Sequence, residues 1–168
     1  MGLIVACSSN NDEKTENIIT SNRKAVISES SDTFINKILG GGGSTIRGFD
    51  LGDPISKVKT NEKLEQFDEE ENILSYTFET PRKEIVDVLY SYDSSKLLNE
   101  VQLDIYLNSE SSALELSKGL NHYFTQKYGQ QLLGLAKPSW SIKDDEVVEI
   151  EIISNKLDKG LQINFKKK

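Results

Sequence analysis

The chain of 168 residues suits one domain with a terminal extension, and its 36% of hydrophobic residues are enough for one compact core. Its net charge of −7 argues against a nucleic-acid partner, since phosphate binding depends on lysine and arginine. One cysteine excludes an internal disulfide framework and a metal site built from several cysteines, and no apolar run reaches the roughly 20 residues that span a bilayer.

The single cysteine, Cys7, lies between a short apolar stretch and a polar run that begins Ser8-Ser9-Asn10. Ile4-Val5-Ala6-Cys7 resembles a bacterial lipobox, in which an apolar residue and then a small residue precede a cysteine that is acylated. The resemblance implies cleavage before Cys7 and a membrane anchor formed by lipid on its thiol. Two acyl chains anchor a protein stably where one does not. We therefore expect a lipoprotein of the bacterial cell envelope, with the membrane and leaflet left open.

The residues before Cys7 are too few for a complete signal peptide, which needs a cationic region and a longer apolar region. We interpret residues 1–6 as the remnant of a signal peptide. Myristoylation at Gly2 is a weaker alternative, because the Ser or Thr that its motif needs at position 6 is Ala6. A free surface cysteine is the other alternative.

Residues 7–45 are rich in Ser, Asn, Thr and charge, which indicates a flexible tether that carries the lipid. A short helix is expected within it, over residues 32–39, with Ser31 or Asp32 as its cap. Its apolar residues form one helical stripe: Phe34, Ile35, Ile38 and Leu39. The glycine run 40–43 indicates a hinge without a role in the core. A single α+β domain is then expected over residues 46–168.

The domain should begin with a short helix over residues 54–62, because Asp53 can cap a helix and Pro54 fits its first position. Alternating apolar residues predict strands around residues 74–78, 86–92, 101–107, 148–152 and 161–165.

A long helix separates the two groups of strands. We expect Asn108 or Ser109 to cap it and Gly129 to end it. Its core stripe is Ala113, Leu116, Leu120, Tyr123 and Phe124. Gly119, at the edge of that stripe, indicates close approach to a strand.

This order predicts an α+β fold, with an antiparallel sheet of about six or seven strands and the helices packed on one face. Each half is a helix followed by a meander, so a degenerate duplication stays open. Gly52, Asp53 and the inward Val58 resemble the helix start of small secreted α+β modules. Examples are the β-lactamase-inhibitor-protein-like fold and the SmpA/OmlA outer-membrane assembly lipoproteins. The resemblance implies a module that binds a protein and catalyses nothing.

Residues suited to catalysis are sparse. His122 is the only histidine, and helical spacing places it on the solvent side of the long helix, so Cys–His and Ser–His–Asp sites lack parts. The acidic runs 68–71 and 144–146 lie between strand patterns, and we interpret them as solvated turns. They lack the spacing of a calcium loop, so no specific metal or cofactor is expected, and weak cation binding is the minor alternative. A hydrolase that uses two carboxylates from different strands stays an alternative.

The candidate binding site is the sheet face turned away from the helices, which we call the outer face. Alternation assigns it mostly polar residues together with four apolar ones: Ile85, Leu89, Tyr106 and Ile153. An apolar patch with a polar rim suits a partner in the cell envelope. One alternative is that the helix carrying Phe34 and Ile38 covers this face. Another is a small apolar ligand carried between sheet and helix, under Tyr76, Tyr123 and Phe124.

Overall fold

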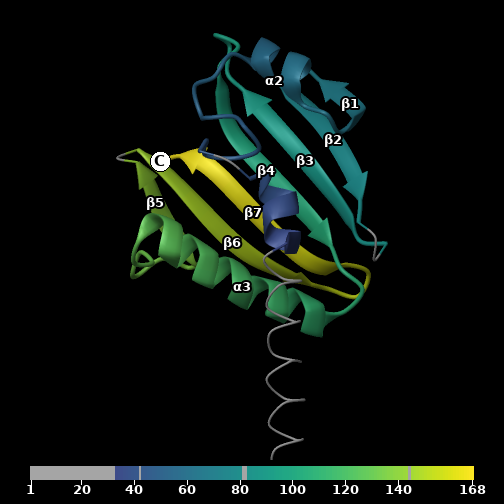
Figure 1. Cartoon of the computed structure of the whole chain (residues 1–168), viewed down its shortest axis with the longest axis vertical. Helices are drawn as coiled ribbons and strands as arrows, with labels where there is room; N and C mark the ends of the chain where they lie inside the picture. Colours follow the sequence, from purple (N-terminus) through teal and green to yellow (C-terminus); the bar gives the residue numbers. More distant parts are fainter. Residues whose placement is uncertain (1–32, 42, 81–82, 144) are drawn as a thin grey trace, which may run out of the picture.

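The structure, a computed structural model, describes residues 33–41, 43–80, 83–143 and 145–168. Within these residues three helices and seven strands follow one another (Figure 1). They are a short helix over residues 33–39, α2 (Ile55–Asn61), β1 (Glu65–Glu70), β2 (Ile73–Glu79), β3 (Ile85–Tyr92), β4 (Leu98–Tyr106), α3 (Glu110–Tyr128), β5 (Ser139–Lys143), β6 (Glu146–Ser154) and β7 (Lys159–Lys167). The predicted order of helix, strands, long helix and strands is confirmed.

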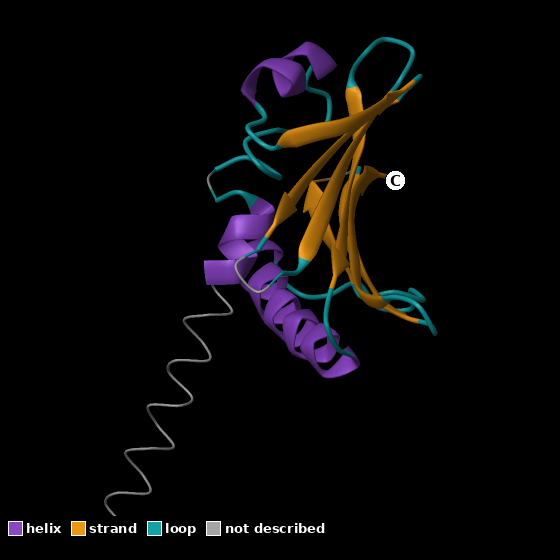
Figure 2. Cartoon of the chain, turned by 90° about the vertical axis from the view of Figure 1, so that its right-hand side faces the viewer, coloured by secondary structure: helices purple, strands orange, loops and turns teal. Residues whose placement is uncertain are grey.

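The seven strands form one antiparallel sheet in the order β1-β2-β3-β4-β7-β6-β5. The meanders β1–β4 and β5–β7 meet in its middle, where β4 pairs with β7. Figure 2 shows the helices on one side of the sheet. The predicted α+β fold, with helices on one face of an antiparallel sheet, is therefore correct.

The core lies between the sheet and the helices, because every second residue of the central strands faces them. In β3 the buried residues are Val86, Val88, Tyr90 and Tyr92, as alternation predicts. From α3 the ring of Phe124 enters the core and lies 5.4 Å from Trp140 and 5.9 Å from Phe165, measured between ring centroids. Aromatic pairs at such distances add stability beyond their buried area.

Helices α2 and α3 begin with different N-caps. In α3 the Ser109 hydroxyl accepts a hydrogen bond from the backbone N–H of Ser112 at 3.1 Å, and Gly129 ends the helix, as expected. In α2 the residue at the N-cap is Pro54, without a side-chain hydrogen bond. The expectation that Asp53 caps this helix is wrong, since its carboxylate accepts from the backbone N–H of Asp50 and from Lys57 instead.

The helix over residues 33–39 is packed onto the domain. Ile35 and Ile38 are 1% and 0% exposed and belong to the same core as the sheet residues. The folded unit therefore includes residues ahead of the boundary expected at residue 46. The part of the expected tether before residue 33 lies outside the described residues, as does the expected cap at Ser31 or Asp32.

Two glycines are explained by this packing rather than by the roles expected for them. A Cβ atom on Gly40 would lie 2.6 Å from the Cα of Arg47, so Gly40 is needed for a tight turn and is more than a hinge residue. A Cβ atom on Gly119 would lie 3.0 Å from Cδ1 of Ile35. Gly119 therefore gives room to the helix over residues 33–39, and the expected approach to a strand is wrong.

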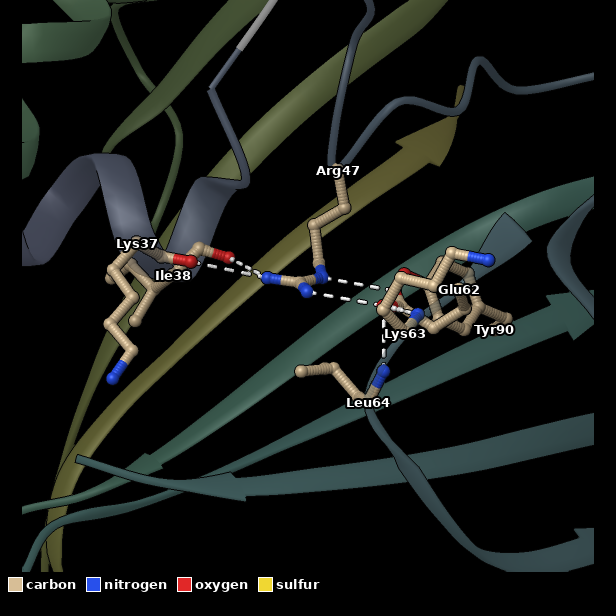
Figure 3. Close-up of polar contacts among 7 residues, drawn as sticks. All are labelled: Lys37, Ile38, Arg47, Glu62, Lys63, Leu64 and Tyr90. Carbon is tan, nitrogen blue, oxygen red and sulfur yellow. Dashed lines mark hydrogen bonds and ion pairs between the residues drawn. The ribbon is translucent and has the colours of Figure 1, made fainter.

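A buried ion pair between Arg47 and Glu62 connects the helix over residues 33–39 to the rest of the domain (Figure 3). Nε of Arg47 donates to Oε2 of Glu62 at 3.1 Å, and the two side chains are 10% and 4% exposed. The other end of the guanidinium donates to the backbone carbonyls of Lys37 and Ile38 at 3.2 and 3.1 Å. Arg47 therefore satisfies orphan carbonyls at the end of the short helix and connects them to α2.

Candidate functional site

Strand pairing brings three of the four predicted apolar residues into one row across the outer face. Ile85 lies opposite Tyr106, Tyr106 lies opposite Gly160, and Gly160 lies opposite Ile153. Ile85 and Tyr106 are 45% and 43% exposed, and Ile153 is half-buried. Leu89 is apart from this row, opposite Gln102. We call Ile85, Tyr106, Gly160 and Ile153 the apolar row.

Gly160 interrupts the apolar row with a position that has no side chain. A Cβ atom there would lie 2.0 Å from the carbonyl oxygen of Ile105, so no other residue fits this backbone. A pocket of about 220 Å³ lies at this point of the sheet. Its lining is Asp104, Ile105, Tyr106, Ile153, Asp158, Lys159, Gly160, Leu161 and Gln162.

Carboxylates lie next to the apolar row. Asp104 lines the pocket and is held by two amide groups, since Nε2 of Gln102 and Nε2 of Gln162 each donate to it at 2.9 Å. Asp87 lies directly opposite Asp104 on the neighbouring strand. The pocket lining therefore combines an apolar wall, formed by Tyr106 and Ile153, with the carboxylates of Asp104 and Asp158.

These surroundings raise the pKa of the Tyr106 hydroxyl. Its partial burial raises the pKa of the hydroxyl, and the negative charges of Asp104, Asp87 and Asp158 raise this pKa further. The three carboxylates are thus close enough to act on the Tyr106 ring electrostatically.

The carboxylates of the outer face differ in whether a cationic side chain lies close enough to form an ion pair. Glu149 forms an ion pair with Lys166 at 2.9 Å, and Glu151 forms one with Lys137. Within residues 33–41, 43–80, 83–143 and 145–168, neither Asp87 nor Asp104 has a cationic side chain within ion-pair distance. Negative charge therefore concentrates beside the apolar row.

The helix carrying Phe34 and Ile38 does not cover the outer face. Ile38 is fully buried in the core, and Ile35 approaches Gly119 of α3, so this helix packs on the same side of the sheet as α3. The alternative that it shields the outer face is wrong. Among the described helices, none lies on the outer face (Figure 2).

Other candidate sites have a structural explanation. The space under Phe124, suggested for a small ligand, is filled by packed rings, including those of Trp140 and Phe165. His122 is exposed, as expected. Of the acidic run 68–71, residues 68–70 lie in edge strand β1 and not in a turn. The buried Arg47–Glu62 pair has its hydrogen-bonding groups occupied by protein atoms.

Two residues of the pocket lining, Lys159 and Gly160, were not among the site residues predicted from the sequence. Both precede the strand expected around residues 161–165, but the structure places them in β7. Extending the alternation of Leu161, Ile163 and Phe165 back by one residue would have placed Gly160 on the outer face. Cys7 lies outside the described residues, so its predicted role has no structural counterpart.

The comparisons with known proteins found no similarity: no family model matches the chain, and neither a curated protein nor a solved structure matches it. In the part of the chain that the structure describes, no helix is long and apolar enough to cross a membrane.

Proposed function

We propose that this protein is a lipid-anchored component of the bacterial cell envelope that binds another envelope protein through the outer face of its sheet. Binding requires no catalytic group in this proposal. Lipid on Cys7 holds the chain at the membrane, and the folded domain presents the apolar row to the partner.

One observation supports this proposal above the others: the described helices all pack on one face, and the opposite face exposes Ile85 and Tyr106 side by side. Large apolar side chains that cluster inside a polar rim are typical of interaction sites. Tyrosine is also enriched at such sites because its ring is apolar and its hydroxyl is polar.

Co-purification from the native cell envelope tests the binding role. The bait is the full-length lipoprotein, compared with an Ile85→Ser, Tyr106→Ser double variant. The matched control is a Leu114→Ser, Phe67→Ser double variant, whose two residues are 46% and 54% exposed on α3 and β1. We expect a partner that is retained by the wild type and the control and lost from the outer-face variant. Equal retention by all three proteins would contradict the proposal.

The anchor is tested separately by membrane fractionation of the wild type and of Cys7→Ser. Both are expressed from the full-length gene with its signal peptide. We expect the wild type to sediment with membranes and to carry acyl groups detectable by mass spectrometry. Cys7→Ser should lack them and leave the membrane fraction, because acyl burial supplies the anchoring free energy. Identical fractionation of the two proteins would refute the lipid anchor.

Carboxylate-dependent hydrolysis is the second candidate, and one observation favours it. Asp87 and Asp104 come from different strands and face each other beside a pocket. If they act together on a substrate, purified protein should release soluble fragments from isolated envelope material, and Asp87→Asn should abolish that release. No release by the wild type would leave the binding role as the better explanation.

A further inference from the structure

We propose that the partner inserts one lysine or arginine side chain into the pocket beside Tyr106. Its aliphatic part would lie against Tyr106 and Ile153, and its charged end would face Asp104 and Asp87. This inference rests on the proposed function and specifies the chemistry of the partner at that site.

The size of the pocket favours one side chain over a small-molecule ligand. Its volume is about 220 Å³, whereas ligand pockets generally measure about 300–1,000 Å³. Its opening lies on a sheet face, where a protein surface can dock without entering a deep cleft. A single long side chain is therefore the fitting occupant.

The carboxylates beside the pocket favour a cationic occupant. Like charges directly opposite each other destabilise an antiparallel pair, and the cross-strand neighbours Asp87 and Asp104 are such a pair. The amides of Gln102 and Gln162 orient Asp104 but bring no positive charge. A cation from a partner would interact favourably with both carboxylates.

Lys159 is the cation already present in the lining, and it is directed elsewhere. Its ammonium group donates to the hydroxyl of Ser154 and to the backbone carbonyl of Asn155, in the turn between β6 and β7. No ion pair joins it to Asp104 or Asp158 among the described residues. The pocket therefore keeps its negative character.

The apolar wall fits the rest of a basic side chain. Lysine and arginine carry apolar stems that pack on hydrophobic surfaces while the charged end stays near polar groups. The ring of Tyr106 adds a cation–π surface, which arginine uses most often. The net charge of −7 would also attract a basic partner over longer distances.

A peptide titration tests this inference without knowledge of the partner. The probe is the capped peptide Gly-Leu-Arg-Leu-Gly, and the matched probe has citrulline, an uncharged analogue, in place of arginine. Binding to the isotope-labelled full chain is followed by the amide NMR signals of Tyr106, Ile153 and Gly160. Asp87→Asn and Asp104→Asn are compared with Asp68→Asn, which removes the same charge from the exposed strand β1.

We expect the arginine peptide to shift these three signals, and the citrulline peptide to bind about tenfold more weakly, as for loss of a hydrogen bond to a charged group. Asp87→Asn should weaken arginine binding similarly, and Asp68→Asn should not. Asp87 is only partly buried, and no ion pair joins it to another described residue, so this variant should keep its fold even if Asp104→Asn does not. Equal binding of both peptides, no shift at all, or equal effects of Asp68→Asn and Asp87→Asn would each overturn the cationic inference.

The same aspartate variants in the co-purification separate this inference from the proposed function. A partner that is lost with the Ile85→Ser, Tyr106→Ser variant but fully retained by Asp87→Asn and Asp104→Asn would support the binding role and overturn the cation. Loss of the partner from the aspartate variants as well would support both.

Discussion

Glu62 connects three segments of the chain through one carboxylate. It accepts hydrogen bonds from Arg47 at 3.1 and 3.2 Å and from the hydroxyl of Tyr90 at 2.5 Å. The backbone N–H groups of Lys63 and Leu64 donate to it as well. Burial alone would raise the pKa of Glu62, but the hydrogen bonds from Arg47 and Tyr90 outweigh it and lower this pKa.

Removing this carboxylate should destabilise the protein strongly. We expect Glu62→Gln to lower the free energy of unfolding by about 3 kcal/mol, because a buried guanidinium loses its counter-charge. Chemical denaturation measures the change. The control is Glu69→Gln, whose ion pair with Lys59 is exposed to solvent and should contribute nothing measurable. Equal stability of the two variants would show that the buried pair is not a stabilising contact.

The same carboxylate predicts a pH dependence. Because the pKa of Glu62 is lowered on folding, its contribution to stability is complete well above its ordinary pKa of 4.5 and decreases as the pH falls through that value. The difference in unfolding free energy between wild type and Glu62→Gln should be constant above about pH 6 and should shrink between about pH 5 and pH 3. A difference that stays constant down to pH 3 would contradict this assignment.

Gly160 should tolerate no side chain. Gly160→Ala would place a methyl group 2.0 Å from the carbonyl oxygen of Ile105, so strand β4 or β7 must shift. We expect a loss of about 2 kcal/mol or more in unfolding free energy. Gly43→Ala is the control, since nothing lies within 4 Å of its added Cβ atom. Equal melting temperatures of the two variants would show that the close approach at Gly160 is absent in solution.

Among the elements, the helix over residues 33–39 changes the expected domain boundary. Ile38 is fully buried in the core, so Ile38→Ala should cost about 2–5 kcal/mol of unfolding free energy. Asn36→Ala, at an exposed position of the same helix, should change stability by less than about 0.5 kcal/mol. Equal unfolding midpoints in denaturant would mean that this helix is not part of the cooperative unit.

The strands were predictable wherever one face is buried. Val86, Val88 and Tyr90 are buried and alternate with exposed or half-buried residues, and this alternation is a direct consequence of the pleat. Strand β1 gave no such signal, because all six residues of Glu65–Glu70 are exposed. Its pairing with β2 along the backbone forms the strand, and a hydrophobic pattern does not reveal such pairing.

Two local features depended on tertiary contacts that the sequence does not display. The polar composition around Ile35 and Ile38 indicated a tether, but packing into the core of the domain buries both. Asp53 had the residue type and the position of a helix cap, but its carboxylate is used by Lys57 and by the turn before it. Composition and capping preferences are weak where a competing partner is near.

At the scale of the whole molecule, the candidate site was predictable in part. Alternation placed Ile85, Tyr106 and Ile153 on the outer face, and strand pairing brings them into one row. The neighbour relation between Tyr106 and Ile153 depends on β4 pairing with β7, which joins strands far apart in the sequence. The pocket between them therefore became visible only in the structure.

The arrangement of the molecule accounts for the proposed role. The described helices cover one side of the sheet (Figure 2), and Ile85 and Tyr106 of the apolar row are exposed on the other side. In our proposal lipid on Cys7 keeps this face near the membrane, where a partner that carries a basic side chain can bind it.

Photo-cross-linking from two neighbouring positions tests the central claim that the outer face binds a partner. Ile152 and Ile153 are consecutive residues of β6 and point to opposite faces of the sheet, and Ile152 is 40% exposed. A photoreactive residue is placed at either position of the full-length protein in living cells. We predict one adduct of defined mass from position 153 and none from position 152. Adducts from neither position, or the same adducts from both, would contradict the claim.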